Sequence, residues 1–222
     1  MAHPLLATVE IETAAKPSRS VIWLHGLGAD GHDFEPAVPQ LARRGGPALR
    51  FVFPHAPVRP VTLNGGLPMR AWYDIGGLDR HSAQDESGIR GSDAALRALI
   101  GRENERGVAT RHIVLAGFSQ GGALALYTGT RLPEQLAGVI GLSCYALLPE
   151  RLAAERHAAN QHTPFLMAHG SLDPVVAPVL GEETRALLIA AGYAVEWHSY
   201  PMGHSVCAEE LAMIAAFLQK VL

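Results

Sequence analysis

Short apolar runs alternate with helical patterns along most of the chain. The runs at residues 20–26, 49–57, 112–119, 136–144, 163–173 and 194–200 are bounded by glycine, proline or polar residues, as buried strands are. Apolar residues recur at helical spacing at residues 33–44, 92–106, 121–131, 181–192 and 208–222. Repeated strand, helix, strand order predicts βαβ units, and therefore a mostly parallel sheet with helices on both faces.

Two segments depart from this alternation. Residues 6–13, LATVEIET, alternate in the way that an antiparallel edge strand does. Residues 54–87 have no sustained period, but they hold a group of large apolar side chains: Leu63, Leu67, Met69, Trp72 and Tyr73. Such a group argues against disorder, and long loops in compact domains are usually functional. We therefore expect residues 54–87 to cover a site.

Length and composition favour one domain with one large core, spanning residues 1–222. The chain is 48% hydrophobic and 18% charged with a formal net charge of −3, which gives no electrostatic footprint for nucleic acid. The first 16 residues lack a basic leader with a long apolar run, and no later run approaches the ~20 residues that span a bilayer. We expect a cytoplasmic protein in which Cys144 and Cys207 are free thiols.

The stretch AGFSQGG places Ser119 in a G-x-S-x-G pattern between a strand pattern and a helix pattern. In a nucleophile elbow, glycines on either side permit a strained turn that exposes the serine hydroxyl at a helix N-terminus. A close-packed glycine turn with Ser119 as a helix cap would give the same sequence pattern. Partner residues must decide between the two interpretations.

A serine hydroxyl needs a base that takes its proton, and that base needs a third group that orients it. Asp173 is the only aspartate after Ser119, and it directly follows a strand pattern. Of the two later histidines, His198 falls inside a strand pattern on the face of Glu196, whereas His204 lies in the loop before the last helix. The order Ser119, Asp173, His204 is that of α/β-hydrolases.

Acyl transfer also needs N–H donors for the developing oxyanion. The backbone amides of Gln120, which follows the serine, and of Leu27, in the loop after an early strand, are the candidates. His25 and His32 lie near Asp30 and Asp33, but no helical H-x-x-x-H or cysteine pair supports a metal site. We expect no metal and no cofactor.

With these residues in place, the chain resembles the phospholipase/carboxylesterase family of small serine hydrolases, which includes bacterial carboxylesterases and acyl-protein thioesterases. The shared pieces, in the family's order, read VIWLHGLGADGHDF, FPHAPVRPVTLNGG, RAWYDI, DESGI, GFSQGGALALYTG, LAGVIGLSCY, HGSLDPVV and GHSVC. They cover nearly the whole chain. The resemblance implies an α/β-hydrolase fold without a separate lid domain.

The resemblance also implies roles and substrates. Ser119 would be the nucleophile, His204 the base and Asp173 its orienter, with the Leu27 and Gln120 amides as the oxyanion hole. An apolar acyl groove would include the residues Leu63, Met69, Trp72 and Tyr145, the last of which stands where thioesterase members often have tryptophan. The expected activity is carboxylic ester hydrolysis.

Two alternatives remain open at this stage. One is acyl-protein thioesterase or lysophospholipase action, because the same site attacks oxygen esters and thioesters. The other is a catalytically silent ligand-binding hydrolase fold. The expected partner is a small-molecule ester or acyl thioester. Relatives often form dimers, so the resemblance leaves a homodimer open.

Overall fold

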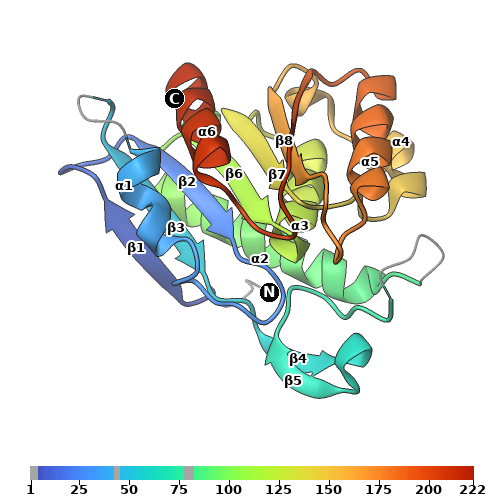
Figure 1. The fold of residues 1–222 in the computed structure, drawn as a ribbon. Helices are drawn as coiled ribbons and strands as arrows, with labels where there is room; N and C mark the ends of the chain where they lie inside the picture. The colour runs from blue at the N-terminus through green and yellow to red at the C-terminus, as the bar shows by residue number, and fades with distance from the viewer. Residues whose placement is uncertain (1–4, 43–45, 78–82) are drawn as a thin grey trace.

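The computed structural model describes residues 5–42, 46–77 and 83–222, and within these residues the chain forms one seven-stranded sheet (Figure 1). Its strands are β1 (Thr8–Glu12), β2 (Arg19–Leu24), β3 (Leu49–Pro54), β6 (Ile113–Phe118), β7 (Gly138–Leu142), β8 (Phe165–Gly170) and β9 (Val195–Tyr200). Their spatial order is β1-β3-β2-β6-β7-β8-β9. β1 pairs antiparallel with β3 and the remaining pairs are parallel. The predicted parallel sheet and its antiparallel edge strand are confirmed.

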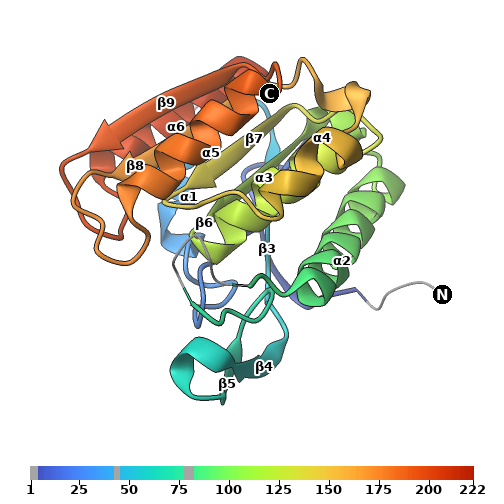
Figure 2. The same cartoon turned by 90° about the vertical axis from the view of Figure 1, so that its right-hand side faces the viewer.

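Helices cover both faces of this sheet. They are α1 (Val38–Leu41), α2 (Glu86–Glu105), α3 (Gln120–Arg131), α4 (Leu152–Glu155), α5 (Pro178–Ala190) and α6 (Ala208–Val221). Short 3-10 turns span Glu35–Ala37, Thr62–Asn64, Thr110–His112, Pro149–Arg151 and Ala158–Asn160. Figure 2 shows α2, α3 and α5 on one face, with α1 and α6 behind the sheet. No helix of the described residues is long and apolar enough to cross a membrane.

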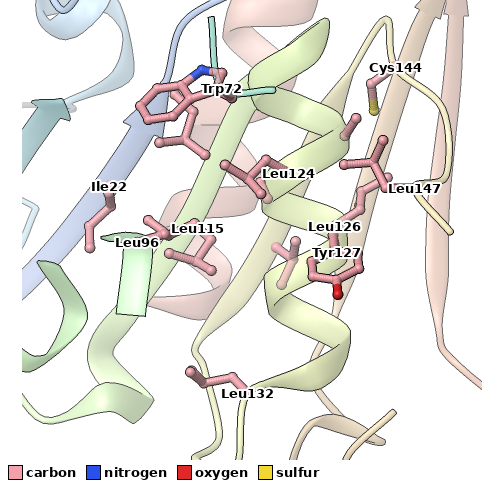
Figure 3. Packing of buried hydrophobic residues seen from close by; sticks show 14 of the residues in the cluster. Ile22, Trp72, Leu96, Leu115, Leu124, Leu126, Tyr127, Leu132, Cys144 and Leu147 are labelled. Carbon is pink, nitrogen blue, oxygen red and sulfur yellow. The ribbon is translucent and has the colours of Figure 1, made fainter. Parts of the chain in front are cut away.

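Two apolar layers result, one on each face of the sheet. The layer under α2 and α3 includes Leu96 and Leu124, which meet Ile22 and Leu115 of the central strands (Figure 3). The layer under α1 and α6 is smaller, and Phe217 is one of its buried side chains. Burial of both faces explains why the central strands read as continuous apolar runs rather than as alternating ones.

The structure differs from the sequence prediction at residues 33–44. A full helix was expected there, but only a 3-10 turn and the four-residue α1 form, and residues 43–45 lie outside the described part. Pro36 and Pro39 are the physical reason, because proline has no backbone N–H to donate within a helix. The helical phase of the apolar residues was correct, since Val38 and Leu41 are buried.

The segment 54–87 is partly regular. It contains a two-stranded antiparallel hairpin, β4 (Val58–Val61) with β5 (Leu67–Arg70), which projects from the edge of the molecule in Figure 1. The left-handed residues Gly65 and Gly66 form its turn. Residues 78–82 lie outside the described part.

Candidate active site

Ser119 occupies a sharp turn between β6 and α3. Its backbone has φ 54° and ψ −120°, a conformation that residues with a side chain rarely adopt. Two glycines make the turn possible. A Cβ on Gly117 would lie 2.4 Å from the Gly121 carbonyl group, and a Cβ on Gly121 would lie 2.4 Å from the Leu24 carbonyl oxygen. The spacing G-x-S-x-G is therefore a steric requirement of this junction, as in a nucleophile elbow.

Ser119, His204 and Asp173 form one hydrogen-bonded chain. The Ser119 Oγ lies 3.0 Å from His204 Nε2, and His204 Nδ1 lies 2.7 Å from Asp173 Oδ2. An ionised carboxylate only accepts hydrogen bonds, so Nδ1 carries the proton and Nε2 is free to accept from the serine hydroxyl. The structure thus brings together the three residues that the sequence nominated, in the orientation that a general base requires.

The Asp173 carboxylate is fixed from several sides. Its side chain has no exposed surface, and Oδ1 accepts hydrogen bonds from the backbone N–H groups of Val175 at 2.8 Å and Val176 at 2.9 Å. The buried His169 lies alongside, with Nε2 at 3.0 Å from the Val176 carbonyl oxygen and 3.5 Å from Asp173 Oδ2. These contacts hold the acid in place. His169 was not predicted from the sequence, because its strand position has no local signal for a polar role.

The His204 ring leans on Phe118, the last residue of β6, with ring centroids 4.7 Å apart. This contact connects the loop before α6 to the strand that ends beside Ser119. His198 lies elsewhere, on β9, where its Nε2 is 3.0 Å from Glu196 Oε1. It has the strand-surface position that its alternation predicted.

The loop after β2 passes beside the elbow. Leu27 is half-buried, and the following N–H of Gly28, a left-handed glycine, donates to the Arg70 carbonyl oxygen at 2.9 Å. Gln120 begins α3, and backbone N–H groups in the first turn of a helix have no acceptor inside that helix. Both predicted oxyanion donors therefore belong to chain segments next to the serine.

Both ring nitrogens of His25 contact backbone groups. Its Nε2 accepts a hydrogen bond from the Ala56 N–H at 3.1 Å, and its Nδ1 lies 2.7 Å from the Gly26 carbonyl oxygen. Burial lowers the pKa of His25, which favours the neutral ring. His32 pairs instead with Glu35 at 2.7 Å. Among the described residues no group of three or more His, Cys, Asp or Glu side chains is arranged to hold a metal ion.

The side chain of Gln120 clamps the segment that follows β5. Its Oε1 accepts from the Trp72 N–H at 2.8 Å, and its Nε2 donates to the Tyr73 carbonyl oxygen at 2.8 Å. From the sequence, a role was predicted only for the backbone N–H of Gln120, as an oxyanion donor. An amide side chain that faces two backbone groups has no local signature, so this role needed the structure.

A cavity of about 230 Å³ opens beyond this clamp. It lies between residues 73–77, residues 145–149 and α5, and its apolar wall includes Ile75, Leu180 and Leu187. The backbone of Tyr73 connects the cavity to Gln120, the residue next to Ser119.

The four residues predicted to form an acyl groove differ in their positions relative to this cavity. Only Tyr145 lines the cavity. Trp72 is 1% exposed, and its Nε1 donates to the His25 carbonyl oxygen at 2.9 Å, so its ring belongs to the core. Leu63, which is 42% exposed, and Met69 lie on the β4–β5 hairpin and its turn, outside the cavity wall. The apolar character of these residues was evident in the sequence, but their places in the fold were not.

Comparisons with known proteins agree with this architecture. A family model described as phospholipase/carboxylesterase matches residues 6–222. Acyl-protein thioesterase 1 of Neurospora crassa is 43% identical over 217 residues, which cover 94% of this chain and 89% of the relative. The predicted α/β-hydrolase fold is confirmed by this match and by solved structures.

Two of these structures are named for different activities. Acyl-protein thioesterase 2 of Zea mays superimposes with a TM-score of 0.85 at 28% identity, covering 96% of this chain and 98% of its own. The esterase PE8 gives a TM-score of 0.82 at 31% identity, with 99% and 100% covered. The elbow, the sheet order and these matches lead to one conclusion: this chain belongs to the phospholipase/carboxylesterase family.

Proposed function

We propose that this protein is a serine esterase that hydrolyses carboxylic esters through an acyl-enzyme on Ser119, with His204 as general base and Asp173 as its orienter. The observation that carries the proposal is the hydrogen-bonded chain from Ser119 Oγ through His204 to Asp173, with distances of 3.0 and 2.7 Å. This hydrogen-bonded chain begins at Ser119, at the junction of β6 and α3 where the G-x-S-x-G pattern predicts a nucleophile.

The reaction proceeds in two halves. Ser119 Oγ attacks the ester carbonyl carbon while its proton passes to His204 Nε2, and the backbone N–H groups of Leu27 and Gln120 stabilise the oxyanion. When the tetrahedral intermediate collapses, the imidazolium gives that proton to the departing alcohol. Water then attacks the acyl-enzyme, giving a proton to His204. Collapse of the second intermediate releases the acid and returns that proton to Ser119.

Acyl thioesters form a second substrate class for the same site. The observation that favours them is the 43% identity to a relative named acyl-protein thioesterase 1. The mechanism is unchanged, since a thiol leaves in place of an alcohol. Matched oxygen esters and thioesters with the same acyl group, compared by kcat/KM, decide which class this chain prefers. Lysophospholipids belong in the same comparison, as oxygen esters with a charged leaving group.

The cavity next to the clamp is the proposed acyl pocket. It is mostly apolar, and burying apolar surface contributes about 0.8 kcal/mol per methylene. A finite cavity predicts that kcat/KM rises over the first carbons of the acyl chain and then levels off. The groove that the sequence suggested, with the hairpin residues Leu63 and Met69, stays a prediction beside this pocket.

The Ser119→Ala variant tests the mechanism. Removing the nucleophile of such a triad lowers the rate by on the order of 10⁶, so hydrolysis and covalent labelling by a fluorophosphonate should both disappear. Thermal unfolding should stay cooperative, because the change removes a single oxygen atom. Persistent labelling of the variant would place the nucleophile elsewhere, and absence of labelling in the unaltered protein would favour a silent ligand-binding fold.

A further inference from the structure

Two tyrosine hydroxyls meet in the wall of the cavity. Tyr73 follows β5 and Tyr145 follows β7, and their Oη atoms lie 3.4 Å apart. Tyr73 is 2% exposed, whereas Tyr145 is partly exposed, and both residues line the cavity. We call these two residues the tyrosine pair.

Only one of the two hydroxyl hydrogens of the tyrosine pair can be donated within the pair. Each phenol carries one O–H donor and also accepts hydrogen bonds. Within the pair one hydroxyl donates to the other, so the second hydrogen needs another acceptor. In the described part of the structure, neither hydroxyl makes a further hydrogen bond. Burial raises the pKa of Tyr73 and of Tyr145, which keeps both phenols protonated at neutral pH.

Neighbouring polar groups of the cavity are occupied by the protein itself. The Thr184 hydroxyl donates to the Leu180 carbonyl oxygen at 2.7 Å and accepts from the Ala146 N–H at 2.8 Å. The Asp74 carboxylate accepts from the N–H and the hydroxyl of Thr62. The remaining tyrosine hydrogen faces a largely apolar cavity, where an unpaired polar group is unfavourable.

We propose that the tyrosine pair is a specificity site for an oxygen atom part-way along the acyl chain, so that this enzyme prefers hydroxy- or oxo-acyl substrates to plain acyl substrates of equal length. This inference rests on the proposed function, because it places the acyl group in the cavity. A site that is built to hydrogen-bond an oxygen discriminates against an analogue that lacks it, since the buried donor is then left unpaired.

The test compares matched aryl esters whose acyl chains are equal in length and differ only in one hydroxyl or keto oxygen, moved one carbon at a time. At one position the oxygenated substrate should have a kcat/KM roughly tenfold above its plain partner, the size expected from one net hydrogen bond. In the Tyr73→Phe/Tyr145→Phe double variant, which has neither hydroxyl, that ratio should fall towards unity, whereas a single remaining hydroxyl would still carry a hydrogen to donate. Tyr193→Phe is the matched control, because its hydroxyl contacts the Thr130 carbonyl oxygen away from the cavity, and it should keep the ratio.

Three outcomes would overturn the inference. The first is a ratio near unity at every position in the unaltered protein. The second is a preference that survives in the double phenylalanine variant. The third is a loss of stability in that variant with oxygenated and plain substrates slowed equally, which would show that the pair only connects two loops. A protein that hydrolyses no plain or oxygenated ester at all would refute the proposed function instead.

Discussion

His204 and His198 show how position decides the role of a residue type. His204 lies in a loop, between a buried carboxylate and the Ser119 hydroxyl. His198 lies on β9, where its ring contacts Glu196 and stacks near Tyr200. Periodicity separated the two in the sequence, because a residue inside an alternating strand has a fixed direction, while a loop residue after a strand end can reach the rim of the sheet.

We expect His204→Ala to lower kcat by at least about 10⁴, because the serine loses its base. His198→Ala should stay within about twofold of the unaltered rate, as surface substitutions usually do. Steady-state kinetics on a short ester measure both. Equal losses in the two variants, or a larger loss for His198→Ala, would contradict the assignment of the base.

The roles of some single residues could be predicted from the sequence, and those of others could not. Ser119, Asp173 and His204 were accessible because each follows a strand pattern and their order is restrictive. The burial of the Trp72 ring could not be predicted, because hydrophobicity does not distinguish a core ring from a binding surface. The clamp by the Gln120 side chain and the support from His169 depend on contacts between distant segments, which no local pattern encodes.

At the scale of elements, the junction of β6 with α3 is defined by contact between backbones. The start of α3 packs so closely on the end of β2 that no Cβ fits at Gly121. The sequence predicted this strand, turn and helix correctly, because period and glycine spacing are local. It did not predict the β4–β5 hairpin, whose strands are short and contain Pro60 and Pro68.

Gly121→Ala should therefore destabilise the protein by about 1 to 3 kcal/mol, the usual cost of overpacking, and should reduce hydrolysis. Gly101→Ala in α2 is the control. A Cβ there has nothing within 4 Å, and replacing a helical glycine with alanine adds about 0.5 to 1 kcal/mol of stability. Urea unfolding measures both changes. A Gly121→Ala protein as stable as the parent would mean that β2 and α3 can separate without cost.

At the scale of the whole molecule, α6 holds a buried acid beneath the loop that carries His204. Glu210 is fully buried, and neither carboxylate oxygen has a partner of normal hydrogen-bond geometry among the described residues. Burial raises the pKa of Glu210 to about 7, and the backbone N–H of Cys207 offsets this only in part. The folded state therefore favours the protonated acid.

This predicts a sign for the pH dependence of stability. A raised pKa contributes stability at pH values below the ordinary pKa of glutamate, and that contribution is lost as the pH rises through 7. Glu210→Gln should match the parent near pH 4 and exceed it above pH 8 by on the order of 3 kcal/mol. Urea unfolding across this pH range measures the difference. Parallel stability profiles for the two proteins would show that Glu210 does not titrate in this way.

The proposed catalytic residues come from distant parts of the chain, and this has a consequence for folding. Ser119 and His204 are separated by 85 positions, and β7, β8, α5 and β9 lie between them in the chain. Contacts of such long range require an entropically costly loop closure and form slowly compared with helices. In a refolding experiment, the circular dichroism of the helices should recover before hydrolysis does. The recovery of enzyme activity would then report the last stage of folding, which spectroscopy of secondary structure alone does not detect.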